Sequence, residues 1–131
     1  MRKTILLPLL ILGVMRADDT NTTSRTQTMQ NMELGMISIQ KGLMYNDRSI
    51  VQKGVEEIKK NAEDIDAFDI KNEKGTNFKA KRYAETESKA ISGLADDMLK
   101  GFDKGDKNRV LDIYRRMQNR CLICHEIIRK W

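Results

Sequence analysis

The chain has 131 residues, of which 24 are Lys or Arg and 19 are Asp or Glu. This length suits one small domain with a modest core. The basic excess is concentrated at the start, since the first 17 residues hold Arg2, Lys3 and Arg16 and no acidic residue. The rest of the chain is close to neutral, so its charge gives no reason to expect a nucleic-acid partner.

The first 17 residues have the form of a secretory signal peptide. Arg2 and Lys3 precede an apolar run over residues 5–14, and the small residue Ala17 follows. The run is well short of the roughly 20 residues that a membrane-spanning helix needs. We therefore predict cleavage near Ala17, a periplasmic location, and no integral membrane segment after cleavage. The domain is predicted over residues 18–131.

The rest of the chain is predicted to be all-α. Its only proline is Pro8, inside the predicted signal peptide, and β-branched runs with a period of two are missing. The first helix is expected to begin near Thr23 or Ser24 and to end near Tyr45. Its apolar residues recur at steps of three and four, as a core-facing helix requires; they are Met29, Met32, Met36, Ile39 and Leu43.

Three more helices are expected. Asp47 is an N-cap candidate for the second, whose core positions are Ile50, Val51, Val55 and Ile58. A longer connection is predicted over residues 61–77 and a third helix from about residue 78 to residue 100. Asp106 is expected to cap a fourth helix with an apolar stripe at Val110, Tyr114, Met117, Cys121, Cys124 and Ile128. Four helices joined by short or moderate connections predict an antiparallel four-helix bundle.

The stretch Cys121-Leu122-Ile123-Cys124-His125 has the C-x-x-C-H pattern that attaches a c-type haem. Two thiols can add across the porphyrin vinyl groups, and His125 can supply an imidazole nitrogen to the iron. On a helix these three side chains share one side. A zinc site would need four ligands of this type, whereas the chain has two Cys and one His. A thioredoxin-like C-x-x-C would follow a strand, and a disulfide within one turn would close almost no loop.

We therefore predict one covalently bound haem c near the C-terminal end of the last helix. With this motif in that place, the chain resembles the class II cytochromes c, which comprise the cytochrome c′ family and its low-spin relatives. The resemblance extends to Glu126 and Arg129 after the motif and to Arg25 one turn before Met29. It implies an exported four-helix bundle, and often a homodimer formed through the first two helices.

The sixth ligand of the iron is the open question of this site. His125 is the only histidine, which leaves a methionine, an open position or a lysine. Met29 lies five residues after Ser24 and His125 five residues before Lys130, so antiparallel first and last helices would place them at one level. The sequence leaves two roles open for Met29, which are ligation of the iron and packing in the core. Met32 is the second candidate, and Met36, Met98 and Met117 are expected to pack in the core.

The predicted function follows from the ligands. Iron bound by His125 and a methionine suits an electron carrier that docks transiently with redox partner proteins. The alternative is a five-coordinate haem protein that binds nitric oxide or carbon monoxide. An enzyme is not expected, because no second histidine exists to act as an acid–base group. Arg25 and Arg129 are candidates to pair with the haem propionates, although each reads equally well as a plain surface charge.

Overall fold

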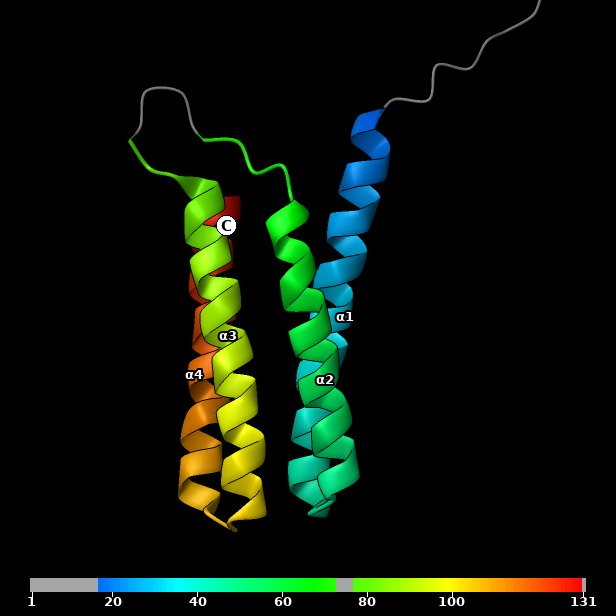
Figure 1. Ribbon diagram of the computed structural model, residues 1–131, viewed down its shortest axis with the longest axis vertical. Helices are drawn as coiled ribbons and strands as arrows, with labels where there is room; N and C mark the ends of the chain where they lie inside the picture. Colours follow the sequence, from blue (N-terminus) through cyan, green and yellow to red (C-terminus); the bar gives the residue numbers. More distant parts are fainter. Residues whose placement is uncertain (1–16, 73–76, 131) are drawn as a thin grey trace, which may run out of the picture.

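The computed structural model describes residues 17–72 and 77–130. The helices are α1 (Ala17–Tyr45), α2 (Arg48–Asp64), α3 (Ala80–Asp103) and α4 (Lys107–Arg129), with a short 3-10 helix η1 (Ile65–Ala67) after α2. The described ranges contain no strand, which confirms the all-helical, four-helix prediction (Figure 1). Residues 1–16 of the predicted signal peptide, the predicted turn at Gly75 and Thr76, and Trp131 lie outside the described residues.

Three predicted helix boundaries are wrong. α1 begins at Ala17 rather than near Ser24, because no proline interrupts the polar segment that leads into it. α2 continues through Asn61 to Asp64, since Asn61 and Ala62 are buried against the bundle and this packing outweighs the local polarity. α3 extends to Asp103 before the turn.

Both predicted N-caps are confirmed. The Asp47 carboxylate accepts hydrogen bonds from the backbone N–H groups of Ser49 at 2.8 Å and Ile50 at 3.2 Å. At α4, Asp106 accepts one from the N–H of Arg109 at 3.0 Å. The two turns lie at the same end of the bundle (Figure 1), where Arg48 also pairs with Asp103 at 2.6 Å. We call this the turn end, and we call the opposite end, where α4 finishes and α3 begins, the open end.

The helices pack unequally around the core. α1 packs on α2, α2 on α3 and α3 on α4, whereas α1 and α4 approach each other less closely than any of these pairs. The tightest contact is between α1 and α2, where a Cβ atom added to Gly54 would lie 2.6 Å from the carbonyl oxygen of Gly35. The first and last helices are therefore separated by a looser seam.

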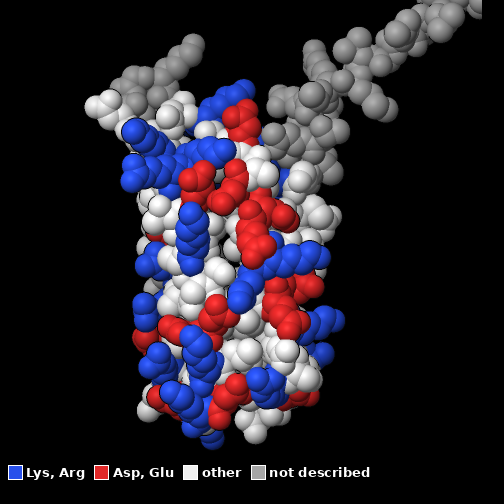
Figure 2. All heavy atoms as spheres, in the orientation of Figure 1, with Lys and Arg blue, Asp and Glu red and all other residues white. Residues whose placement is uncertain are grey.

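The bundle surface is charged with both signs. Figure 2 shows basic and acidic side chains interspersed over most of the face that it presents. One of the ion pairs joins two helices, Lys59 of α2 and Asp96 of α3, at 2.7 Å. Among the described residues, no helix has the length and apolarity to cross a bilayer.

Candidate haem site

The three residues of the C-x-x-C-H motif lie in the last three turns of α4, which is continuous from Lys107 to Arg129. The helix therefore places Cys121, Cys124 and His125 on one side, as the spacing predicts. All three are partly buried, and Cys121 packs against the hydrophobic core. The two cysteines are free thiols and do not form a disulfide.

Burial controls the ionisation of the two thiols. It raises the pKa of Cys121, and the Glu87 carboxylate adds to the effect. Burial raises the pKa of Cys124 to about 11, with smaller contributions from Glu87 and Cys121. Redox-active C-x-x-C motifs have thiols with lowered pKa values. The environment in α4 raises the pKa of both thiols instead, so it differs from that of such motifs.

Burial also acts on the imidazole. It lowers the pKa of His125, and the charge of Arg129 lowers it further. The ring is therefore neutral at physiological pH. Neutral imidazole is the form that binds metals, so the ionisation of His125 fits the role of an axial ligand.

The level of His125 relative to α1 follows from a contact lower in the seam. The Tyr114 hydroxyl of α4 donates to Oε1 of Gln40 in α1 at 3.4 Å. Eleven residues are close to three helical turns, about 16 Å, so they lead to the same side of each helix. Eleven residues further toward the open end are His125 on α4 and Met29 on α1. Counting from this contact, we expect Met29 and His125 to lie at a similar level along the seam.

The Gln40–Tyr114 contact gives a reference point that does not depend on where the helices begin and end. The count from the helix ends assumed a first helix beginning near Ser24, which is wrong, but the Gln40–Tyr114 contact leads to the same residue. Met32 is 7% exposed within the core, and the same register places it level with residue 122. Met29 and Met36 are partly buried against the core. Met29 is thus the methionine that best matches the level of His125.

The part of α3 at the open end buries small side chains. Arg120 of α4 pairs with Glu87 of α3 at 2.8 Å, which places the haem motif level with the first three turns of α3. The buried residues of those turns are Ala80, Ala84 and Ser88. Further toward the turn end, the buried residues of α3 include the larger Ile91, Leu94 and Met98 besides Ala95 and Gly101. The large side chains of Ile65 and Phe68, which follow α2, are buried at this end as well. What fits the predicted haem is the donor set, two thiols and a neutral imidazole on one side of α4.

The two arginines predicted to contact the haem propionates lie at the open end. Arg25 is partly buried in α1, and its Nη1 donates to the backbone carbonyl of Asp69 at 3.2 Å. Arg129 is exposed in the last turn of α4. Arg25 lies one turn from Met29, and Arg129 lies one turn from His125. Their role toward a haem stays a prediction.

Two features of the site were missed from the sequence. Gln40 was given no role, and Tyr114 was expected only to pack, because a contact between helices 74 residues apart leaves no local signal. The small buried residues Ala80 and Ser88 did leave one, since together with Ala84 they recur every four residues in the otherwise polar first half of α3.

The described residues contain no group of three or more His, Cys, Asp and Glu side chains placed to hold a metal ion. No protein-family model, curated protein or solved structure matches the chain. The function is therefore argued from the motif and its surroundings.

Proposed function

We propose that this protein is an exported, periplasmic cytochrome that carries single electrons. In this proposal one haem c is joined to Cys121 and Cys124, and its iron is bound by His125 and Met29. The observation that carries the proposal is the C-x-x-C-H motif on one side of the last helix. The count along α1 and α4 from the Gln40–Tyr114 contact supports Met29 as the second ligand.

Each residue has a separate task. A bound haem would supply a one-electron couple, whose potential the axial ligands help to set. Cys121 and Cys124 would hold the macrocycle against the core, and His125 would present a neutral nitrogen. Met29 would present a soft sulfur, which raises the potential and excludes external ligands. Because glycine contacts hold α1 on α2, the backbone of Met29 would move little when the iron changes oxidation state.

Arg25 and Arg129 would pair with the two carboxylates on the haem edge. A guanidinium can bind a carboxylate through two parallel hydrogen bonds. Arg25 is supported in this role by its anchoring to the connection after α2, because its Nη1 is hydrogen-bonded to the carbonyl of Asp69. The remaining N–H groups of Arg25 would be available to a propionate.

The loose seam also favours a second candidate function. α1 is less close to α4 than to α2, so the side of the haem opposite His125 would be open if Met29 only packs there. The protein would then bind nitric oxide or carbon monoxide at a five-coordinate iron. The two functions differ in one property, which is whether the Met29 sulfur reaches the iron.

The visible spectrum of the purified, full-length exported protein tests both. The electron-carrier proposal expects haem that stays with the polypeptide on extraction with acidified organic solvent, a low-spin ferric spectrum with a methionine–iron charge-transfer band, and slow binding of carbon monoxide after reduction. A high-spin ferric spectrum with fast carbon monoxide binding would favour the gas-binding function. Haem that is released into the solvent would contradict covalent attachment. Mass spectrometry of the same sample would test cleavage after Ala17.

A further inference from the structure

The ion pair between Glu87 of α3 and Arg120 of α4 is the most buried ion pair of the described residues. Nη1 of Arg120 lies 2.8 Å from Oε2 of Glu87. The Glu87 side chain is 13% exposed, whereas the side chains in the other four pairs are 39–70% exposed. Solvent and salt screen exposed charges strongly and buried charges much less. Among the paired carboxylates, Glu87 therefore has the charge that acts most strongly inside the protein.

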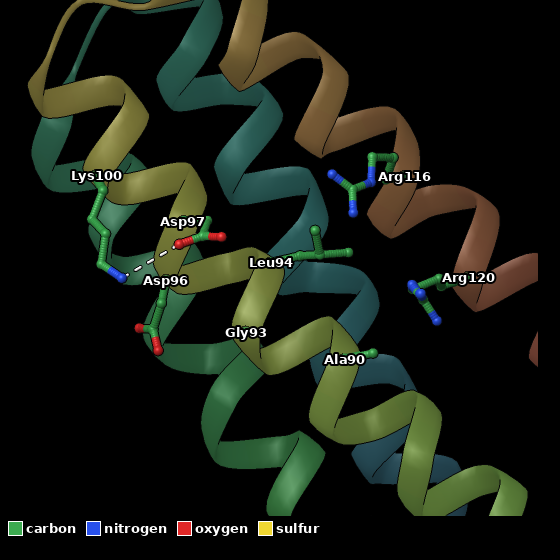
Figure 3. Close-up of a pocket in the computed structure, with 8 residues that line it drawn as sticks. All are labelled: Ala90, Gly93, Leu94, Asp96, Asp97, Lys100, Arg116 and Arg120. Atoms are coloured by element: carbon green, nitrogen blue, oxygen red, sulfur yellow. Dashed lines mark hydrogen bonds and ion pairs between the residues drawn. The ribbon is translucent and has the colours of Figure 1, made fainter.

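Arg120 is the more exposed partner of this pair, at 38%. It extends from α4 toward α3 and lines a shallow groove of about 420 Å³ between the two helices (Figure 3). Gly93 of α3 and Arg116 of α4 also line the groove, and Glu87 does not. Glu87 thus lies within the interface between α3 and α4, and Arg120 lies at the edge of that interface.

The packing of α3 on α4 places this pair next to the haem motif. One turn from Glu87 toward the open end is Tyr83, and one turn from Arg120 in the same direction is Cys124. Counting from the ion pair, Tyr83 and Cys124 lie at the same level. The raised pKa of Tyr83 agrees with this placement, since burial, Glu87 and Cys124 raise it in that order. Cys121 directly follows Arg120, so the ion pair is close to both cysteines of the motif.

The charge of Glu87 acts on both cysteines. Burial is the main cause of the raised pKa of each thiol, and the Glu87 carboxylate raises the pKa of both further. A negative charge on α3 is therefore felt at the two positions where the proposed haem would be attached.

We propose that Glu87 lowers the reduction potential of the cytochrome and that Arg120 is its counter-charge. The inference rests on the proposed electron-carrier function. Oxidised haem iron carries one more positive charge than reduced iron, so a nearby carboxylate stabilises the oxidised state and a nearby guanidinium opposes this effect. Glu87 would therefore limit the rise in potential that the Met29 sulfur produces. Arg120 would keep the Glu87 carboxylate ionised in its buried position.

A purely structural role for the ion pair predicts different behaviour. A buried ion pair often contributes little to stability, because taking two charges out of water costs about as much as their attraction returns. Removing either partner leaves an uncompensated charge, so both single variants would lose stability. A structural pair would leave the potential unchanged or would shift it in the same direction in both variants. Charges that act on the haem shift the potential in opposite directions.

Redox titration of the purified, exported holoprotein at pH 8 measures the effect of each charge. At the ambient potential where the wild type is half reduced, Glu87→Gln is expected to raise the ratio of reduced to oxidised protein roughly three- to tenfold. For a one-electron couple this is a rise of about 28–59 mV. Arg120→Gln is expected to lower the ratio, because it leaves the carboxylate uncompensated. The double variant should lie between the two, near the wild type.

The matched control is the pair of Arg48 and Asp103 at the turn end, which is joined by contacts of 2.6 and 3.0 Å. Asp103→Asn and Arg48→Gln remove the same charges at the opposite end of the bundle from the motif, so the potential should stay as in the wild type. The visible spectrum should be unchanged in every variant, because none changes a predicted iron ligand. Shifts of the same sign in Glu87→Gln and Arg120→Gln, unchanged potentials in both, or an equal shift in Asp103→Asn would overturn the proposal.

The reactivity of the motif thiols gives a readout that needs no haem. The probe is iodoacetamide at pH 8, applied to the full chain produced without the cofactor, and the thiolate is the form that reacts. Glu87→Gln removes a charge that raises the pKa of both thiols, so alkylation should be roughly two- to fivefold faster. Arg120→Gln should slow alkylation, whereas a loosened fold would speed it in both variants. Faster alkylation in both, or a wild type that reacts as fast as the chain unfolded in guanidinium, would contradict the placement of Glu87.

The outcomes separate this proposal from the function on which it rests. Covalent haem with a potential that does not follow the two charges would overturn the role of Glu87 and leave the electron carrier standing. A protein exported without covalent haem would overturn the electron-carrier function and, with it, any role of Glu87 in a reduction potential. A high-spin haem protein whose potential still follows the two charges would support the role of Glu87 and overturn the electron carrier.

Discussion

Helix α1 has two lateral faces that are built in opposite ways. The face toward α2 contains Gly35 and Gly42, which pack closely against α2. Gly54 of α2 lies against this face, so the two backbones approach each other closely. On another side, the Gln40 side chain accepts a hydrogen bond of 3.4 Å from Tyr114 of α4, and helical spacing puts Met29 and Met36 on the same side of α1 as Gln40. The first face leaves no room for a methyl group, whereas the second is lined by long, adaptable side chains.

One face of α1 therefore fixes the position of the helix, and the other is the one that would take part in function. A close glycine contact fixes the position of α1 with little freedom, because any shift brings backbone atoms into collision. The methionine side chains on the other face can adjust to what lies between α1 and α4. In the proposed cytochrome, the α2 face would hold Met29 at the required level, and the α4 face would receive the haem.

The largest effect is expected when the proposed haem is lost from the seam between α1 and α4. Cys121→Ala and Cys124→Ala should each weaken or abolish covalent attachment, and the double variant should carry no covalent haem. In the proposed cytochrome the macrocycle takes the place of core side chains at the end of α4, so its loss would leave a cavity, which costs several kcal/mol in a folded core. The measurements are haem staining on a denaturing gel and the melting temperature. Leu122→Ala is the matched control, because Leu122 is 51% exposed. A haem-free variant that melts like the wild type would show that the core is complete without haem.

The second effect concerns the other face of α1. Gly54→Ala places a methyl group 2.6 Å from the carbonyl oxygen of Gly35 and 2.8 Å from the backbone nitrogen of Ile39. Overpacking against backbone costs roughly 1–3 kcal/mol, and it should lower the denaturant midpoint whether or not haem is bound. The control is Gly93→Ala on the exposed side of α3, which meets nothing and should stabilise the helix by about 0.5–1 kcal/mol. Equal midpoints for the two variants would contradict the close α1–α2 contact.

The sequence was informative wherever the signal is local. Asp47 and Asp106 were recognised as N-caps because capping involves a residue and its neighbours within three positions. The spacing of the cysteines and the histidine likewise determines that they share a side of α4. The start of α1 was misplaced because polar residues are ordinary in the first turns of a helix. The burial of Asn61 was missed because its partner, Asn31 of α1 at 3.1 Å, is 30 residues away.

The same reasoning explains what was predicted of the site. The motif and a stripe of methionines were evident from the sequence. The methionine level with His125 was chosen by counting from the start of the first helix, and that start was wrong. The register of α1 against α4 depends on the contact between Gln40 and Tyr114, which tertiary packing alone creates. The groove beside Arg116 was missed for a similar reason, since Gly93 and Arg116 come from different helices.

The third prediction separates the two candidate ligands in the seam. Met29→Leu conserves volume, so it should change stability by less than about 1.5 kcal/mol, yet it removes the sulfur. The ferric protein should become high-spin, its methionine–iron band should disappear, its potential should fall, and carbon monoxide should bind the ferrous form readily. Met32→Leu is the control and should leave the spectrum nearly intact, because Met32 packs in the core. The reverse result would move the ligand one turn along α1, and a wild type that is already high-spin would favour gas binding.

The smallest expected effect tests the register of the seam itself. Tyr114→Phe removes the hydrogen bond to Gln40 and keeps the ring, so the cost should be below about 1 kcal/mol. If this contact helps to hold α1 beside α4, the variant should bind carbon monoxide faster than the wild type while its resting spectrum stays low-spin.

Burial raises the pKa of Tyr114, so the folded state holds this proton more tightly than the unfolded state. Its contribution to stability is present below the unfolded pKa of about 10 and is lost as the pH rises through the folded value. The stability difference between wild type and Tyr114→Phe, measured by denaturant unfolding, should therefore be constant through neutral pH and shrink in alkaline solution. Gln40→Leu should reproduce the faster carbon monoxide binding, because it removes the other partner of the same bond. Faster binding in neither variant would mean that the bond does not set the separation of α1 and α4.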